Sequence, residues 1–240
     1  MIEARNITIW HTPAHPILQD ASFTLQRGEL VALLGRNGAG KSTLMRAIAA
    51  LQPIRGGEIV IDGELCSRLT EQQRALLVAI VTTDRIRIPG LSCFDLVALG
   101  RTPHTNWIGS LSDYDREVVE ASLAQVDASH LTHIDCDTLS DGELQRIMIA
   151  RALAQQTPII MLDEPTAFLD MPSRHQLLQL LQHLAHTQQK CIIYSSHELS
   201  LALKASDRVA IIHPPQLLIH TPQQVRQQQI IAKVFGITDE

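Results

Sequence analysis

One stretch of the sequence has the composition and spacing of a loop that binds phosphate groups. Residues 35–43 fit the pattern GxxxxGK[ST]. Glycines let consecutive backbone N–H groups point into one concavity, Lys41 can neutralise the outer phosphates, and the Ser42 hydroxyl can ligate Mg²⁺. An ordinary glycine turn is the alternative, but the loop lies between an apolar run and a helical pattern, as a phosphate loop requires. The predicted nucleotide-binding residues are Gly35, Arg36, Asn37, Gly38, Ala39, Gly40, Lys41, Ser42 and Thr43.

Two carboxylates follow a second apolar run, Ile159–Leu162. Asp163 at the end of a buried strand beside a phosphate loop is suited to hold Mg²⁺ through water. Glu164 has a separate task available, because a carboxylate near the γ-phosphate can orient the attacking water and act as general base. An isolated Asp-Glu pair is more often a solvated turn, but together with the phosphate loop the pair predicts a magnesium ligand and a catalytic base.

A third candidate segment stands directly before a helical pattern. Residues 139–143 read Leu-Ser-Asp-Gly-Glu, and Leu144, Ile147 and Met148 form an apolar face after them. Ser140 and Glu143 have the spacing of a capping box, which completes a helix N-terminus. A helix N-terminus with a serine and a glycine also attracts anions, so both interpretations stay open here.

These groups need a scaffold that alternates strands and helices, and the apolar patterns predict one. Short continuous apolar runs predict strands at Leu30–Leu34, Ile159–Leu162 and Cys191–Tyr194. Helical spacing follows the phosphate loop at Leu44, Ala47, Ile48 and Leu51, and it recurs over Pro172–His186 at Leu177, Leu180, Leu181 and Leu184. This alternation is typical of helices packed on a mostly parallel sheet.

Two segments depart from the alternation. Residues 1–27 and 57–63 read as short alternating strands with an Asp-Gly turn, which predicts an antiparallel layer. Residues 91–154 read as mostly helical, with Ser112 and Asp115 at a helix start. The predicted fold class is therefore α/β: a P-loop NTPase core with a parallel sheet, an antiparallel β lobe and an inserted helical lobe, in one domain over residues 1–240.

Composition limits the classes of partner. The chain has 240 residues, 45% of them apolar, and a formal net charge of −5, which disfavours a surface that coats nucleic acid. No apolar run reaches the roughly 18 residues of a membrane span, and residues 1–10 lack a signal pattern. The four cysteines are far apart and predict reduced thiols rather than a zinc cluster. We therefore expect a protein that stays in the cytoplasm unless another component recruits it.

The order of the motifs resembles the ATP-binding subunits of ABC transporters. The phosphate loop, residues 139–143, Asp163-Glu164-Pro165, Leu169-Asp170 and Ser196-His197 follow one another as in that family. The resemblance implies that Ser140 and Gly142, in the signature motif, contact ATP held by a second subunit. It also implies that Leu169-Asp170 is a dimer-contact loop and that His197 is a switch histidine at the γ-phosphate. Without the resemblance, His197 after a buried strand reads as a structural histidine.

A finer resemblance lies in the helical lobe, although glycine and proline alone would explain a turn there. Residues 99–104, then Gly109, Asp115 and Val119, are similar to ATPases that serve importers of iron-siderophore complexes, haem or vitamin B12. This implies an ATP- and Mg²⁺-dependent homodimer that drives membrane permease subunits at the cytoplasmic face of the membrane, with a substrate-binding protein as an indirect partner. The alternatives are an ABC-type ATPase acting on nucleic acid and a P-loop kinase, which leaves residues 139–143 unexplained.

The sequence departs from that family at three places. The signature carries Asp141 and Glu143 where the family usually has glycine and glutamine. The glutamine that follows the strand at 77–81, and reaches the Mg²⁺ in the family, is replaced by Thr83, with Asp84 beside it. The aromatic ring expected to stack on adenine falls at His11 or at Trp10.

Overall fold

The computed structural model describes residues 1–12, 15–83, 88–105, 109–167 and 169–235. The strands are β1 (Ile2–Thr12), β2 (His15–Leu25), β3 (Leu30–Gly35), β4 (Gly56–Ile61), β5 (Glu64–Leu65), β6 (Val78–Val81), β7 (Ile159–Leu162), β8 (Cys191–Ser195), β9 (Arg208–His213) and β10 (Gln216–His220). The α-helices are α1 (Lys41–Ile48), α2 (Glu71–Leu77), α3 (Cys93–Ala98), α4 (Asp113–Gln125), α5 (Asp141–Ala154), α6 (Met171–Gln188), α7 (Leu199–Ala205), α8 (Pro222–Gln227) and α9 (Ile230–Phe235). Short 3₁₀ turns are η1 (Cys66–Arg68), η2 (Leu99–His104), η3 (Ser129–Leu131) and η4 (Cys136–Thr138).

A six-stranded sheet in the order β10-β9-β3-β8-β7-β6 forms the centre of the molecule. Its strands are parallel except β10, which pairs antiparallel with β9. Every residue of β3, β7 and β8 is buried, because both faces of the sheet are covered. Val31 and Leu33 face one apolar cluster, and Leu30, Ala32 and Leu34 face the other. The predicted α/β class with a parallel sheet is confirmed.

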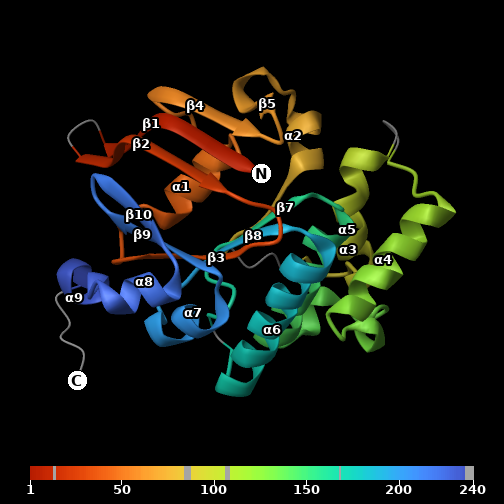
Figure 1. The fold of residues 1–240 in the computed structure, drawn as a ribbon. Coiled ribbons are helices and arrows are strands. Elements are labelled where there is room, and N and C mark those ends of the chain that lie inside the picture. The colour runs from red at the N-terminus through yellow and green to blue at the C-terminus, as the bar shows by residue number, and fades with distance from the viewer. Residues whose placement is uncertain (13–14, 84–87, 106–108, 168, 236–240) are drawn as a thin grey trace.

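A second, antiparallel sheet in the order β2-β1-β4-β5 covers one face of this core, with α1 between the two sheets (Figure 1). The hairpin from β4 to β5 turns through Asp62 and Gly63, whose φ values of 50° and 88° fit a type I′ turn. This is the turn that the Asp-Gly pair predicts.

The helices α3, α4 and α5 lie between β6 and β7 in the chain and stand to one side of the sheets (Figure 1). A serine caps the N-terminus of each of these helices. The side chains of Ser92, Ser112 and Ser140 accept hydrogen bonds from the backbone N–H three residues later, a donor that the helix itself leaves unpaired. The mostly helical character predicted for residues 91–154 is confirmed.

Two details of the predicted elements are wrong. Leu51 is 63% exposed, because α1 ends at Ile48 and Ala50 takes a left-handed backbone with φ of 53° that turns the chain away. Leu77 is the last residue of α2, so β6 begins one residue later than predicted.

The four cysteines lie in the interior of the protein. Cys66, Cys93, Cys136 and Cys191 are unpaired and buried. Burial raises the pKa of Cys66 to about 11 and that of Cys191 to about 12, which makes these thiols unreactive. Within the described ranges, no helix is long and apolar enough to cross a membrane.

Candidate functional site

The phosphate loop joins β3 to α1, as predicted from the sequence. Gly38 and Gly40 have φ values of 76° and 101°, a left-handed backbone that side chains other than glycine seldom adopt. A Cβ atom on Gly40 would lie 2.4 Å from Cγ2 of Ile17 in β2, so this position has no room for one. Arg36, Asn37 and Gly38 are exposed, and the helix dipole of α1 adds positive potential at the loop. The loop therefore presents backbone donors to solvent at a helix N-terminus.

Lys41 is the first residue of α1 and is only 6% exposed. Its ammonium group donates to the carbonyl oxygen of Gly35 at 3.2 Å and lies 3.4 Å from Nε2 of His197. Burial lowers the pKa of Lys41, while the nearby carboxylates of Glu164 and Asp163 oppose that change. The amine thus sits beside both carboxylates with few protein partners of its own.

Asp163 follows the last residue of β7 and is 7% exposed. Its Oδ1 accepts a hydrogen bond of 2.6 Å from the Ser195 hydroxyl. Within the described part of the chain, no group donates a hydrogen bond to its other carboxylate oxygen. A carboxylate oxygen and the Ser42 hydroxyl, next to Lys41 on α1, are the hard oxygen donors that Mg²⁺ prefers, so these residues fit a magnesium site.

Glu164 has a left-handed backbone, with φ of 50°, which is uncommon for a residue with a side chain. Its backbone N–H donates to the Ser195 hydroxyl at 2.8 Å, and its Oε1 is hydrogen-bonded to Nε2 of His197. The carboxylate is 33% exposed and so is accessible to water. Because β3, β8 and β7 are neighbours and parallel, their carboxyl ends bring Lys41, His197, Glu164 and Asp163 to one edge of the sheet.

The family follows from comparison with known proteins. Residues 18–167 match the family model described as ABC transporter. The chain belongs to the ABC transporter family. Its fold is that of an ABC ATPase, and the chain is an ATPase.

Two sequence relatives and one solved structure are similar to this chain over most of its length. A petrobactin import ATP-binding protein of Bacillus anthracis is 34% identical over 220 residues, which are 91% of this chain and 81% of the relative. A hemin import ATP-binding protein of Burkholderia thailandensis is 35% identical over 238 residues, covering 92% and 88% of the two chains. A dimeric bacterial ABC transporter cassette superposes with a TM-score of 0.81 at 25% identity, covering 92% of this chain and 99% of the other.

The signature segment of this ABC ATPase forms the capping box that its spacing predicts. The Ser140 hydroxyl donates to Oε2 of Glu143 at 2.6 Å, and the Ser140 backbone N–H donates to the same oxygen at 2.9 Å. These hydrogen bonds from Ser140 lower the pKa of Glu143. Among the described residues, no hydrogen bond joins this segment to the phosphate loop.

A link between Leu169-Asp170 and His197 was not predicted from the sequence. Arg174 on α6 donates to the carbonyl oxygen of Leu169 at 2.8 Å and forms an ion pair of 2.8 Å with Glu198, the residue after His197. Asp170 begins α6 by accepting from the backbone of Ser173 at 3.0 Å. The opposite charges of Arg174 and Glu198 stand close to two motifs in the sequence, and only the fold brings them together.

For three predicted positions, Thr83, His11 and Trp10, the structure shows no hydrogen bond to the groups at the sheet edge among the residues that it describes. Thr83 follows β6 and is exposed, while Asp84 lies outside the described residues. The backbone of His11 belongs to β1, but its side chain lies outside the described part. Trp10 is half-buried, and the guanidinium group of Arg55 lies over its ring, 5.4 Å from the centroid.

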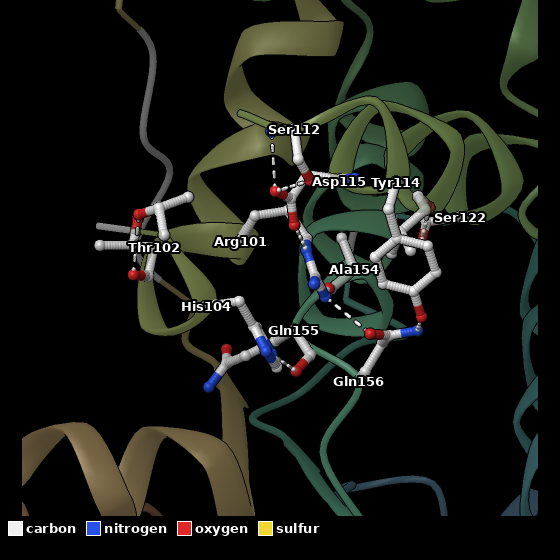
Figure 2. A network of polar contacts seen from close by, with 12 residues as sticks. Arg101, Thr102, His104, Ser112, Tyr114, Asp115, Ser122, Ala154, Gln155 and Gln156 are labelled. Carbon is white, nitrogen blue, oxygen red and sulfur yellow. Dashed lines mark hydrogen bonds and ion pairs between the residues drawn. The ribbon is translucent and has the colours of Figure 1, made fainter. Parts of the chain in front are cut away.

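The segment with the finer resemblance forms a buried polar network around Arg101 (Figure 2). Arg101 is 2% exposed, and its Nε forms an ion pair of 2.8 Å with Asp115. Its guanidinium also donates to the Ala154 carbonyl oxygen at 2.7 Å and to Oε1 of Gln156 at 2.8 Å. The turn interpretation for residues 99–104 is incomplete, because η2 is a 3₁₀ helix that buries a paired charge.

Asp115 is held from two sides. The hydroxyl and the backbone N–H of Ser112 donate to Oδ2, and Arg101 donates to Oδ1. These bonds, first those of Ser112, lower the pKa of Asp115 to about 2. The network joins η2, the start of α4 and the end of α5, and so fixes the helical lobe internally.

Proposed function

We propose that this chain is the ATP-hydrolysing subunit of a membrane importer whose cargo is an iron-siderophore complex, haem or cobalamin. The observation that carries the proposal is the meeting of Lys41, Glu164 and His197 at one sheet edge beside the phosphate loop. The import relatives named above support the transport role and the class of cargo. The membrane partner is a separate permease, and we place the chain at the cytoplasmic face of the inner membrane.

In this proposal the chain's own groups bind the triphosphate and activate water. The backbone N–H groups of residues 36–43 and the Lys41 ammonium hold the outer phosphates. Ser42, and Asp163 through water, would hold Mg²⁺, which would supply neutralisation of the phosphate charge. Glu164 accepts the proton of the attacking water, and His197 orients its carboxylate and contacts the γ-phosphate. The same atom of His197 faces Lys41, so all three groups converge where the γ-phosphate belongs.

The proposed functional unit contains two copies of the chain. Ser140 and Gly142 of one copy contact ATP held by the phosphate loop of the other, which requires the Ser140 hydroxyl to turn away from Glu143. A ring from His11 or Trp10 stacks on adenine; for Trp10, Arg55 would have to share or leave the ring. The helical lobe, residues 91–154, contacts the permease, and a substrate-binding protein acts through that permease.

The chemical assignment is tested by Glu164→Gln. The amide keeps the shape of the side chain but loses its proton affinity, so ATP still binds while hydrolysis falls by about 10²-fold or more. Fluorescent nucleotide binding, phosphate release and size-exclusion chromatography with ATP and Mg²⁺ measure the three properties. We expect a trapped dimer. A monomer with wild-type turnover would contradict the proposal.

The shared site is tested by Ser140→Arg. The larger cation blocks the signature face but leaves the phosphate loop of the same chain intact, so nucleotide still binds while the ATP-dependent dimer is lost. Dimer formation at wild-type ATP concentrations would favour helix capping as the sole role of Ser140. Glu120→Arg on the exposed face of α4 provides a control for added charge in the same lobe.

The transport role is tested with the permease itself. A candidate hydrophobic permease from the same genome is co-expressed with this chain, and the two proteins are purified together. Uptake of radiolabelled iron-siderophore, haem and cobalamin into vesicles then identifies the cargo. Stable association and ATP-dependent uptake of one of these is the expected result; stimulation by nucleic acid without permease association would contradict it.

A further inference from the structure

Ser195 is the last residue of β8, and its side chain is not used in the scheme above. The residue is 0% exposed. Its hydroxyl donates to Oδ1 of Asp163 at 2.6 Å and accepts from the backbone N–H of Glu164 at 2.8 Å. A hydroxyl group has one donor and two acceptor lone pairs, so this single side chain serves both residues at once.

The strand register explains why Ser195 reaches both neighbours. Leu162 pairs with Tyr194 where β7 and β8 run parallel, so Asp163 and Ser195 are the next residues at the same end of the two strands. This is the end at which the phosphate loop lies. A serine at this position places its short hydroxyl between the strands, within reach of the next strand's side chain and backbone.

The two hydrogen bonds of Ser195 hold the Asp163 carboxylate and the Glu164 backbone, which have few other hydrogen-bond partners in the described part of the chain. Among the described residues, Ser195 is the sole hydrogen-bond donor to the Asp163 carboxylate, so it selects which carboxylate oxygen stays available. Glu164 has φ of 50°, a conformation that costs free energy and persists only when surrounding bonds hold it. The bond to Ser195 holds the backbone from which the Glu164 side chain extends.

We propose that Ser195 is a positioning residue for ATP hydrolysis, acting on the metal-binding carboxylate and on the general base through one hydroxyl. It touches neither nucleotide nor water in this role. The proposal rests on the proposed functions of Asp163 and Glu164. Groups that orient a metal-binding carboxylate typically alter metal affinity or activity by 10- to 100-fold when removed, which sets the size of the expected effect.

Ser206 offers a matched control. Ser206 is also buried, and its hydroxyl is bonded to the hydroxyl of Tyr194 at 2.8 Å, away from the site. Ser206→Ala and Ser195→Ala each remove one buried hydroxyl that is bonded to a side chain. The two variants therefore share a structural cost but differ in contact with Asp163 and Glu164.

The experiment measures nucleotide affinity with Mg²⁺ and with EDTA, together with steady-state hydrolysis against Mg²⁺ concentration. For Ser195→Ala we expect kcat to fall about 10- to 100-fold and half-saturating Mg²⁺ to rise about tenfold. ATP affinity in EDTA stays unchanged, because among the described residues no hydrogen bond joins Ser195 to the phosphate loop. Ser206→Ala keeps the wild-type Mg²⁺ dependence, and Ser195→Thr, which keeps a hydroxyl, restores most of it. Thermal melting confirms that each variant is folded. If the added methyl group of threonine unfolds the protein, Ser195→Cys replaces Ser195→Thr. The cysteine thiol is a weak donor, so this variant should give an intermediate Mg²⁺ dependence.

Wild-type kcat and Mg²⁺ dependence in folded Ser195→Ala would overturn the inference, as would an equal change in Ser206→Ala. Glu164→Gln and Asp163→Asn, measured in parallel, separate the two levels of the argument. If they abolish hydrolysis while Ser195→Ala does not, the positioning role alone fails. If they retain wild-type hydrolysis, the proposed roles of both carboxylates fail, and the inference fails with them.

Discussion

The helical lobe and the nucleotide site both bury charge, but they treat it in opposite ways. Around Arg101, the guanidinium meets a carboxylate, a backbone carbonyl and an amide oxygen, and Asp115 is bonded on both oxygens. At the sheet edge, Lys41 has one carbonyl and a histidine nitrogen at the limit of hydrogen-bond distance. A Glu164 carboxylate that is a third exposed completes this edge.

The difference shows what each region is built for. A buried polar network whose groups are mutually satisfied fixes one conformation of the lobe. A buried amine with few partners costs stability by itself, but it retains hydrogen-bonding capacity for a ligand that brings negative charge. Substitutions in the two regions should therefore separate stability from activity.

The largest expected effect is on the stability of the lobe. Arg101→Met leaves Asp115 as a buried carboxylate without its cation, which lowers the free energy of unfolding by about 3–5 kcal/mol. The double variant with Asp115→Leu removes both charges and recovers most of that loss. Urea unfolding followed by circular dichroism measures both. A loss below about 1 kcal/mol in the single variant would show that the pair contributes little.

The next effect is on activity alone. Lys41→Ala removes the charged contact to the outer phosphates, and we expect ATP hydrolysis to fall by about 10²- to 10³-fold. Stability should stay equal or rise, because burial already disfavours the charged amine and lowers its pKa.

Lys190 is the matched control for Lys41. It is another partly buried lysine whose pKa is lowered by burial, and it donates to the carbonyl oxygen of Thr157 at 2.7 Å, away from the sheet edge. Lys190→Ala should lower stability and leave turnover per folded molecule unchanged. If the two lysine variants show the same stability and the same ATP hydrolysis, Lys41 has no role in activity that Lys190 lacks.

A smaller effect comes from acid. The pKa of Asp115 is lowered to about 2 in the folded protein, so the unfolded chain binds a proton at this residue more readily than the folded chain does. The stability contributed by Asp115 is therefore present above about pH 4 and is lost between about pH 4 and pH 2. Between pH 5 and pH 3, the urea midpoint should fall less for Asp115→Asn than for the wild type. An equal decrease in both would contradict the assignment.

The smallest expected effect is at Thr83. A glutamine reaches further than threonine toward the metal and the attacking water, so Thr83→Gln should raise basal hydrolysis a few-fold and weaken stimulation by the permease. Hydrolysis is measured alone and in the assembled complex. No change in either condition would mean that Thr83 lies outside the site.

The sequence predicts local structure well where the deciding residues are close together in the chain. The phosphate loop, the Asp163-Glu164 pair and the capping boxes each lie within a few consecutive residues, and strand and helix patterns flank them. The antiparallel layer follows from alternation and an Asp-Gly turn. In such segments the neighbours in sequence are also the neighbours that decide the conformation.

Two contacts between distant parts of the chain were not predicted. Ser195 meets Asp163 from 32 residues away, and Arg101 meets Gln156 from 55 residues away. A buried serine on a strand and an arginine in a glycine-containing turn look ordinary until the strand register and the helix packing are fixed. The error at Leu51 is local instead, because nothing in the apolar spacing marks the left-handed backbone at Ala50.

The carboxyl-terminal end of α5 is joined to the core by hydrogen bonds. Gln155, directly after α5, donates to the carbonyl oxygens of Ala75 and Val78 at 2.5 and 3.1 Å. A Cβ atom on Gly100 would lie 2.2 Å from the carbonyl oxygen of Arg151, so α5 is also closely packed there. A helix of 14 residues is about 21 Å long, and Ser140 stands at its far end. A rotation of the lobe about the Gln155 end therefore displaces the other end of α5 most. About 10° of tilt moves Ser140 by nearly 4 Å, which is more than the length of a hydrogen bond.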